Sequence, residues 1–394
     1  MAGGPGSYVF GKEELQEVME VMQSGYLFRY GDPSDPRFLH KCVDFENLFA
    51  EKMQVRHALA TTSGTVSLMA ALAALGIGAG DEVIVPGYTF IASISSILLM
   101  NATPVLAEID ESLTIDPEKL EALITPRTKA IIPVHMLGNP CDMDAVMKVA
   151  KAHGLYVLED ACQACGASYH GKRVGTIGDI GAFSLNIFKT ITSGDGGAVI
   201  TDSDDLYERA FAFHDQGHKP MRMGVEVGNR NMIGMNMRMN ELTGAVALAQ
   251  LRKLDDILAT LRCKKKKLKT ALAGIPGVGF RRINDTAGEC ATLLTLLFES
   301  KAMADAFCGK VGSATVSHSG WHVYNNMEQI LNYPGMNFKA HMLPATDDIL
   351  ERAVNISVGV VDKGLGSKYG ININSTDEEI AEVAKTIRET IESL

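Results

Sequence analysis

The 394-residue sequence has no internal repeat, no low-complexity stretch and no excess of positive charge. With 46% hydrophobic and 21% charged residues, its composition is far from that of a disordered chain and matches that of a soluble globular enzyme. The formal net charge of −10 disfavours nonspecific binding to nucleic acid. The sequence also shows no secretory signal peptide, so we expect a cytoplasmic protein.

Cysteine is scarce, and its pattern argues against a disulfide framework. The seven cysteines are odd in number and scattered, which predicts reduced thiols. Cys162 and Cys165 form a C-x-x-C, but a zinc site would need a second ligand pair nearby. A thioredoxin-like motif would need to open a helix in a much smaller fold. We therefore expect no metal site.

Long uninterrupted apolar runs are also lacking. Residues 89–107 are long enough to raise the question of a membrane span, but several serines, Asn101 and Pro104 interrupt them. A buried helix followed by a strand explains this segment better, and we expect no contact with a membrane.

What the sequence does have is a steady alternation of short apolar runs and helix-like segments, which indicates an α/β fold. Most of the runs are short and β-branched, as expected of strands that helices cover on both faces. We predict a seven-stranded, mostly parallel sheet from the strands His57–Thr62, Glu82–Pro86, Pro104–Asp110, Lys129–Met136, Tyr156–Ala161, Gly181–Asn186 and Gly197–Thr201.

The chain is longer than one hydrophobic core usually serves, so we expect a large domain at residues 1–255 and a smaller αβ domain at residues 256–394. After Glu241, leucines at three- and four-residue spacing predict a long helix that leaves the large domain. The chain ends in an amphipathic helix, Thr376–Leu394. We expect the N-terminal helix near Lys12–Gln23 to pack against it.

A first candidate site is the segment Thr61–Thr65 (TTSGT), which lies between a predicted strand and a helix-forming run. A helix that begins there would present free N–H groups and a partial positive charge to a phosphate. Gly64 would let the backbone approach the ligand closely. The alternative is an ordinary helix cap, because Ser and Thr are common at that position.

Two further segments place charged side chains directly after buried strands. Asp160 ends one strand, and in open α/β sheets ligands bind beyond the carboxyl ends of the strands; a helix cap is the alternative. Lys189 follows another strand and is flanked by apolar residues. A buried lysine has a lowered pKa, which suits an amine that forms imines. Ser184, on the same stretch, could add a hydroxyl to a phosphate site.

The motifs SGT, EDACQACGA, GDIGAFSLNIFKTITSGDGGAVIT and GMNMRMNELTGAVALAQL, in this order, resemble the DegT/DnrJ/StrS sugar aminotransferases, which have the aspartate-aminotransferase fold. The resemblance runs from Phe10 to the C-terminus. It implies an enzyme that uses pyridoxal 5'-phosphate and forms a homodimer. Asp195 stands where the family usually has Glu, and Leu185 where Phe is common; neither change touches the chemistry.

The resemblance also implies roles for the residues that match the family's motifs. Lys189 would be the Schiff-base lysine and would later move the proton, and Asp160 would pair with the pyridine nitrogen. Asn236 would reach the phosphate of the neighbouring subunit's cofactor, so that the homodimer shares its active sites. The residues that would bind the other parts of the cofactor are Gly64, Thr65 and Ser184 at the phosphate, Phe90 on the ring face and Gln163 at the ring hydroxyl.

Three local strings, FGKEELQEVMEVMQSGYLFRYG, HDQGH and WHVYNN, look like the branch that aminates an eight-carbon keto-deoxy sugar acid, the 8-amino-3,8-dideoxy-manno-octulosonate aminotransferases. The expected reaction transfers an amino group, from glutamate by resemblance, to a keto or aldehyde sugar such as 3,8-dideoxy-8-oxo-manno-octulosonate. The alternatives are a 3-amino-5-hydroxybenzoate synthase-like enzyme, a nucleotide-sugar aminotransferase and a noncatalytic regulator that binds the cofactor.

Six residues are candidates for contacts with the substrate: Arg29, His218, Arg230, Trp321, His322 and Tyr324. Arg29 and Arg230 could clamp a carboxylate or a phosphate with bidentate geometry. For both arginines a surface ion pair is the alternative. His218 is more often a satisfied polar residue than an acid or a base.

Overall fold

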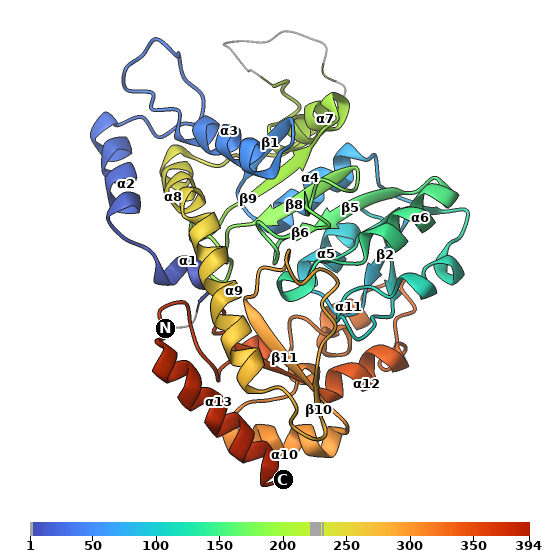
Figure 1. Ribbon diagram of the computed structural model, residues 1–394. Helices are drawn as coiled ribbons and strands as arrows, with labels where there is room; N and C mark the ends of the chain where they lie inside the picture. The colour runs from blue at the N-terminus through green and yellow to red at the C-terminus, as the bar shows by residue number, and fades with distance from the viewer. Residues whose placement is uncertain (1–2, 221–229, 231) are drawn as a thin grey trace.

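The structure is a computed structural model that describes residues 3–220, 230 and 232–394 (Figure 1). Within these residues, seven strands form the central sheet in the order β1-β9-β8-β5-β4-β2-β3. They are β1 His57–Thr61, β2 Glu82–Pro86, β3 Thr103–Ala107, β4 Thr128–Ile131, β5 Tyr156–Asp160, β8 Ile180–Ser184 and β9 Gly197–Thr201. Only β9 runs antiparallel to its neighbours, β8 and β1, and the other adjacent pairs are parallel. The predicted seven-stranded, mostly parallel sheet is confirmed.

Helices cover both faces of this sheet, which explains why its strands are mostly apolar. Every residue of β2 (EVIVP) and of β8 (IGAFS) is buried. One face packs against α4 Gly64–Ala74, α5 Ile91–Leu99 and α7 Asp204–His214. The other face packs against α3 Lys41–Met53, α6 Met143–His153 and α8 Glu241–Arg252. The two shortest strands, β6 Ser168–Tyr169 and β7 Lys172–Arg173, form a separate hairpin.

The C-terminal part of the chain builds a second, three-stranded antiparallel sheet. Its strands are β10 Val278–Phe280, β11 Leu293–Phe298 and β12 Ala353–Ser357, in that order. The helices of this part are α9 Leu254–Ala271, α10 Lys301–Val311, α11 Glu328–Leu331, α12 Pro344–Arg352 and α13 Asp377–Glu392. Short 3-10 helices in the described residues are η1 Pro117–Lys119, η2 Glu121–Leu123, η3 Met136–Gly138, η4 Val316–His318, η5 Tyr324–Asn326 and η6 Lys363–Leu365.

The long helix that the leucine pattern predicted is two helices, because the chain turns at Lys253 between α8 and α9. The Lys253 ammonium is held there by the carbonyl of Val9 and by Glu14. The predicted domain boundary at residue 255 falls in the first turn of α9 and stays a prediction. Within the described residues, no helix is long and apolar enough to cross a membrane.

The expected packing of the N-terminal helix against the C-terminal helix is wrong. The N-terminal helix, α2 Lys12–Ser24, packs against α8, whereas α13 packs against α9 and α10 (Figure 1). Polar contacts draw α2 to α8: the Glu14 carboxylate accepts a hydrogen bond from Gln250 at 2.8 Å. The short helix before it, α1 Pro5–Tyr8, follows Gly3, which forms a backbone bridge with Val361 of the C-terminal part.

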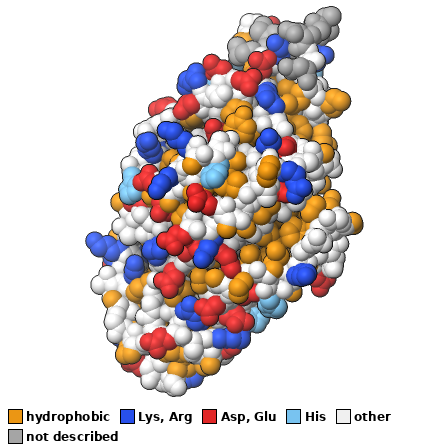
Figure 2. Space-filling model, turned by 90° about the vertical axis from the view of Figure 1, so that its right-hand side faces the viewer, with side chains coloured by type: hydrophobic (Ala, Val, Ile, Leu, Met, Phe, Trp, Pro, Cys, Tyr) orange, Lys and Arg blue, Asp and Glu red, His pale blue; other side chains and the backbone are white. Residues whose placement is uncertain are grey.

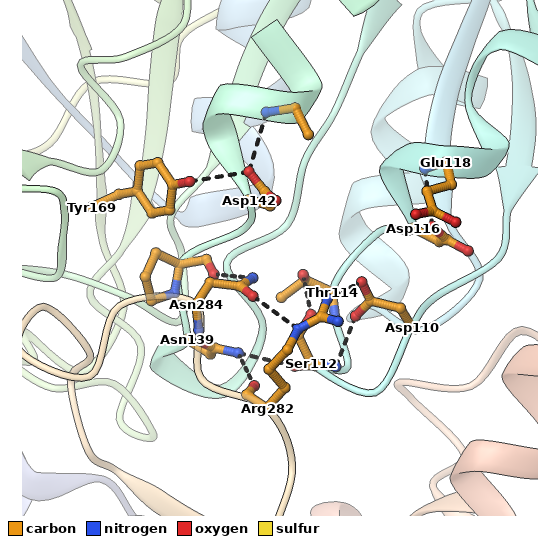
Figure 3. A network of polar contacts seen from close by, with 12 residues as sticks. Asp110, Ser112, Thr114, Asp116, Glu118, Asn139, Asp142, Tyr169, Arg282 and Asn284 are labelled. Carbon is orange, nitrogen blue, oxygen red and sulfur yellow. Dashed lines mark hydrogen bonds and ion pairs between the residues drawn. The ribbon is translucent and has the colours of Figure 1, made fainter. Parts of the chain in front are cut away.

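A network of polar side chains fixes the C-terminal part onto the large sheet (Figure 3). Asn139 donates hydrogen bonds to the carbonyls of Ser112 and Arg282, each at 3.0 Å. Arg282 forms an ion pair with Asp110, and Asn284 donates to the carbonyl of Pro140 at 3.0 Å. Because Arg282 and Asn284 follow β10, these bonds hold the second sheet close to the carboxyl edge of the first.

Candidate active site

A cavity of about 500 Å³ lies at the carboxyl edge of the large sheet. β1, β2, β5 and β8 all end at this edge, because they run in the same direction. The C-terminal part supplies the opposite wall, so both halves of the chain enclose the space. The lining residues with polar or aromatic side chains include Ser63, Thr65, Phe90, Ser93, Asp160, Cys162, Gln163, Ser184, Asn186, Lys189, Asp195, Trp321, His322 and Asp362.

The first turn of α4 forms one end of the cavity. Ser63 caps this helix by accepting a hydrogen bond from the Val66 N–H at 3.3 Å. Among the described residues, the backbone N–H groups of Gly64 and Thr65 find no acceptor. A Cβ atom on Gly64 would lie 2.6 Å from the Cβ of Ser184, so only glycine fits there. This turn can therefore hold a phosphate between two free amides and the hydroxyl of Ser184.

Asp160 ends β5 as a buried carboxylate that its neighbours orient. One oxygen accepts a hydrogen bond from the Ser93 hydroxyl at 2.6 Å, and the other accepts one from the Cys162 N–H at 3.0 Å. Ser93 in turn lies 2.6 Å from the hydroxyl of Thr89. This chain of bonds keeps an anion fixed in the cavity, where it can stabilise a protonated ring nitrogen.

Lys189 follows β8 in a turn that backbone and side-chain bonds fix. Its N–H donates to the carbonyl of Asn186 at 2.9 Å, and the Asn186 amide donates to Asp195 at 2.9 Å. Burial lowers the pKa of the Lys189 ammonium, while the nearby Cys162, Asp160 and Asp362 act in the opposite direction. Within the described part of the chain, the amine has no hydrogen bond or ion pair. A neutral amine without a salt-bridge partner is the form of lysine that can attack a carbonyl group.

Two aromatic rings flank this amine. Nζ of Lys189 lies 5.9 Å from the ring centroid of Phe90, the residue before α5. The ring of His322 lies 5.3 Å from that of Phe90, and its Nδ1 lies 2.9 Å from the Ser319 hydroxyl. Burial and the charge of Lys189 lower the pKa of His322 to about 3, so this imidazole is neutral at physiological pH.

Gln163 is held by the backbone of a strained turn. Its side-chain oxygen accepts a hydrogen bond from the Leu137 N–H at 3.1 Å, so its amide group is free to face the cavity. Leu137 has a φ of 55°. From the C-terminal part, the buried Arg281 donates to the carbonyls of Met136 and Leu137 at 3.1 and 2.9 Å. This arginine thus braces the turn that orients Gln163.

The cavity brings together nine of the fourteen residues that the sequence predicted. They are Gly64, Thr65, Phe90, Asp160, Gln163, Ser184, Lys189, Trp321 and His322. The roles of these residues toward a cofactor or a substrate stay predictions.

Arg29 and Tyr324 lie elsewhere, which corrects their expected contact with the substrate. Arg29 is buried in an ion pair with Glu46 at 2.7 Å and also donates to the carbonyl of Ala60. Tyr324 is fully buried, where its hydroxyl accepts a hydrogen bond from the Leu343 N–H at 2.9 Å. Both side chains hold the fold together and are not directed into the cavity.

Three other predicted residues lie outside the cavity of the single chain. A guanidinium nitrogen of Arg230 lies 3.0 Å from Nδ1 of His218, and Asn236 is exposed beside its bridge partner Asp215. The expected reach of Asn236 to a neighbouring subunit's site stays a prediction.

Sequence reasoning missed Asp362, which lines the cavity from the C-terminal part. It follows β12, but the strands of the C-terminal part were not predicted from the sequence and no recognised motif contains it. Cys162 was noted only as half of a C-x-x-C. In the structure its thiol lines the cavity and Cys165 is buried away from it, and both are free thiols.

A held carboxylate, a buried lysine amine and a capped helix start lie together at the carboxyl edge of the sheet, which is the arrangement that an enzyme forming imines with a phosphate-bearing ligand would need. A family profile, the DegT/DnrJ/EryC1/StrS aminotransferase family, matches residues 9–361. The chain belongs to this family. The aminotransferase family that the sequence predicted is thereby confirmed.

Among its relatives, a GDP-perosamine synthase from Caulobacter vibrioides is 44% identical over 62% of this chain and 63% of its own length. An L-glutamine:2-deoxy-scyllo-inosose aminotransferase from Streptoalloteichus tenebrarius is 43% identical over 58% of this chain and 56% of its own. The chain thus matches less than two thirds of either relative. The structure of a 3-amino-5-hydroxybenzoic acid synthase covers 100% of both chains with a TM-score of 0.84 and 28% identity.

The residues of the cavity fit pyridoxal 5'-phosphate. The glycine cradle and free amides at the start of α4 suit its phosphate. The held carboxylate of Asp160 suits its ring nitrogen, and the amine of Lys189 suits its aldehyde.

Replacing Gly64 by Ala should weaken cofactor binding, because the added methyl group would lie 2.6 Å from Ser184 in the phosphate cradle. We expect the dissociation constant of pyridoxal phosphate to rise about tenfold, the effect of about 1–3 kcal/mol of overpacking. It is measured by titrating apoenzyme and following the cofactor's absorbance. Gly309→Ala is the matched control, since a Cβ there meets nothing within 4 Å. Equal affinity in the two variants would contradict the phosphate site.

The lowered pKa of Lys189 gives a pH prediction. Burial destabilises the ammonium, so the neutral amine persists at a lower pH than in an ordinary lysine. The rate at which apoenzyme captures the cofactor should therefore rise with an apparent pKa below the value of about 10.4 for a free lysine. Stopped-flow absorbance, with Nα-acetyl-lysine as the reference amine, measures this rate. A profile that follows the reference amine would show that Lys189 is not the capturing group.

Proposed function

We propose that this protein is a pyridoxal-phosphate-dependent aminotransferase that moves an amino group from an amino acid to the carbonyl carbon of a sugar-like substrate. The observation that carries the proposal is the arrangement of Lys189 and Asp160 in one cavity with the free amides of α4. Family membership and the names of the relatives support it.

The residues of the chain would divide the work as follows. When bound, the cofactor supplies an electron sink for the negative charge that forms on the reacting carbon. Asp160 keeps the ring nitrogen protonated, which makes that sink effective. Lys189 would first hold the cofactor and would then, as a neutral amine, take a proton from the substrate carbon and deliver it to the cofactor carbon. Neutral His322 narrows the cavity without adding a competing charge.

The substrate is a keto or aldehyde sugar, for which the expected 3,8-dideoxy-8-oxo-manno-octulosonate remains one candidate. The name of the Caulobacter relative points instead to a nucleotide-linked sugar, and the Streptoalloteichus enzyme is named for a cyclitol. The likeness to a 3-amino-5-hydroxybenzoic acid synthase keeps that alternative open. A noncatalytic regulator would capture the cofactor through the same amine of Lys189 but would not transfer an amino group. We further propose a cytoplasmic location.

The amino donor is tested together with the reaction. Adding glutamate to the cofactor-loaded enzyme should convert the absorbance of the lysine-bound cofactor to that of pyridoxamine phosphate. Glutamine, which the Streptoalloteichus relative's name includes, is tested in parallel.

The Lys189→Ala variant should lower the rate of repeated turnover by a factor of more than about 10³, because it lacks the amine that moves the proton. Lys148→Ala, an exposed lysine on α6 outside the cavity lining, controls for loss of charge. No absorbance change with any amino acid would refute amino transfer.

We also propose that the enzyme is a homodimer, as the resemblance implied. The helix α2 buries polar residues and exposes apolar ones. Glu14 and Glu17 are buried against α8. On the opposite side, Leu15, Met19 and Met22 are 60%, 44% and 61% exposed. An exposed stripe of this kind marks a surface that a partner covers. Figure 2 shows a further band of hydrophobic side chains along the right-hand edge of another face of the molecule.

The double substitution Leu15→Lys and Met22→Lys should convert the dimer to a monomer, because it places two charges in the buried apolar contact. Light scattering coupled to size-exclusion chromatography gives the mass. Leu99→Lys is the matched control, since Leu99 is also 60% exposed but lies at the end of α5. A wild-type protein that is monomeric at micromolar concentration would disprove the dimer.

A further inference from the structure

The wall of the cavity opposite the large sheet carries a carboxylate that the proposed chemistry does not use. Asp362 follows β12 and caps η6, where its Oδ1 accepts a hydrogen bond from the Gly364 N–H at 2.7 Å. Among the described residues, no side chain donates a hydrogen bond to this carboxylate or forms an ion pair with it. It lines the same cavity as Lys189, whose positive charge lowers the pKa of the Asp362 carboxyl against the effect of burial.

Trp321 and this carboxylate both approach Gly364. A Cβ atom on Gly364 would lie 3.2 Å from Oδ1 of Asp362 and 3.7 Å from Cδ1 of Trp321, so both groups lie over the same glycine. The Trp321 side chain is 56% exposed. Its carbonyl accepts a hydrogen bond from the Ile91 N–H at 2.9 Å, which anchors the residue next to Phe90. The result is a broad apolar ring next to a fixed acceptor at the wall of the cavity.

We propose that Asp362 and Trp321 form a specificity subsite for a neutral, hydroxyl-rich part of the sugar substrate. This proposal rests on the proposed function and adds which chemical groups of the substrate the enzyme selects. A sugar presents hydroxyl donors at its edge and C–H groups on its face. An ionised carboxylate only accepts hydrogen bonds, so Asp362 matches the hydroxyl groups. The indole ring matches the C–H face.

The same wall disfavours an anionic group. Burial raises the pKa of the Asp362 carboxyl, while the Gly364 N–H and the charge of Lys189 act against that rise. No arginine is among the described residues that line the cavity. A substrate carboxylate or phosphate placed against Asp362 would therefore meet like charge and no guanidinium. A sugar acid or a nucleotide-linked sugar would have to direct its anion away from this wall.

Trp321 also makes the subsite measurable, because it is the single tryptophan of the chain. The cofactor-loaded enzyme is titrated with D-mannose as a neutral probe and with D-mannuronate as its anionic counterpart, and the tryptophan fluorescence is followed. We expect saturable binding of D-mannose and weaker binding of D-mannuronate. Asp362→Ala should weaken D-mannose binding about tenfold, the effect of losing hydrogen bonds to a charged acceptor, and should reduce the discrimination against D-mannuronate.

Two further variants sharpen the test. Gly364→Ala keeps both side chains but inserts a methyl group 3.2 Å from Oδ1 of Asp362, and it should also weaken D-mannose binding. Asp348→Asn removes one negative charge from a carboxylate that is 66% exposed on α12, and it should bind D-mannose like the wild type. Thermal unfolding and cofactor absorbance check that each variant is folded and loaded.

The outcomes separate this subsite from the proposed reaction. Equal D-mannose affinity in wild type, Asp362→Ala and Gly364→Ala, or no saturable fluorescence change in the wild type, overturns the subsite. If amino acids change the cofactor absorbance while D-mannose binding is independent of Asp362, only the subsite fails. If D-mannose binding depends on Asp362 but no amino acid changes the absorbance, the subsite stands and the aminotransferase proposal fails.

Discussion

The electrostatic relation between a lysine amine and a fixed carboxylate is the constraint on which the rest of the site depends. Lys189 is buried in the cavity, and this burial destabilises its positive charge. Asp160 supplies a carboxylate that the Ser93 hydroxyl and the Cys162 N–H hold in place. Because β5 and β8 are parallel neighbours, their ends bring the two groups to the same edge of the sheet. The topology thus places a base and an anion together without forming a salt bridge between them.

The C-terminal part of the chain completes the site. Arg281 braces the turn at Leu137, which in turn orients Gln163. The polar network around Asn139 holds the neighbouring segment (Figure 3). With this half in place, Trp321 and Asp362 form a wall opposite the residues proposed to bind the cofactor. The large sheet would therefore determine the chemistry, and the C-terminal wall would select the substrate.

The sheet was predictable from sequence because buried parallel strands leave a local signal: short apolar runs between helices. The cavity residues on those strand ends, Asp160 and Lys189 among them, were predictable for the same reason. Arg29 was not, because its partner Glu46 lies on α3 and only the packing of α3 brings the pair together. The packing of α2 depended equally on long-range contacts, since its buried face is polar. Asp362 is positioned by the second sheet, and no sequence motif marked it as a cavity residue.

The most direct test of the account is chemical. The enzyme loaded with pyridoxal phosphate is treated with borohydride, digested and analysed by mass spectrometry. The account predicts that the reduced cofactor is found on the peptide that contains Lys189 and that Lys189→Ala protein yields no modified peptide. A reduced cofactor on another lysine, or none on any, would contradict it.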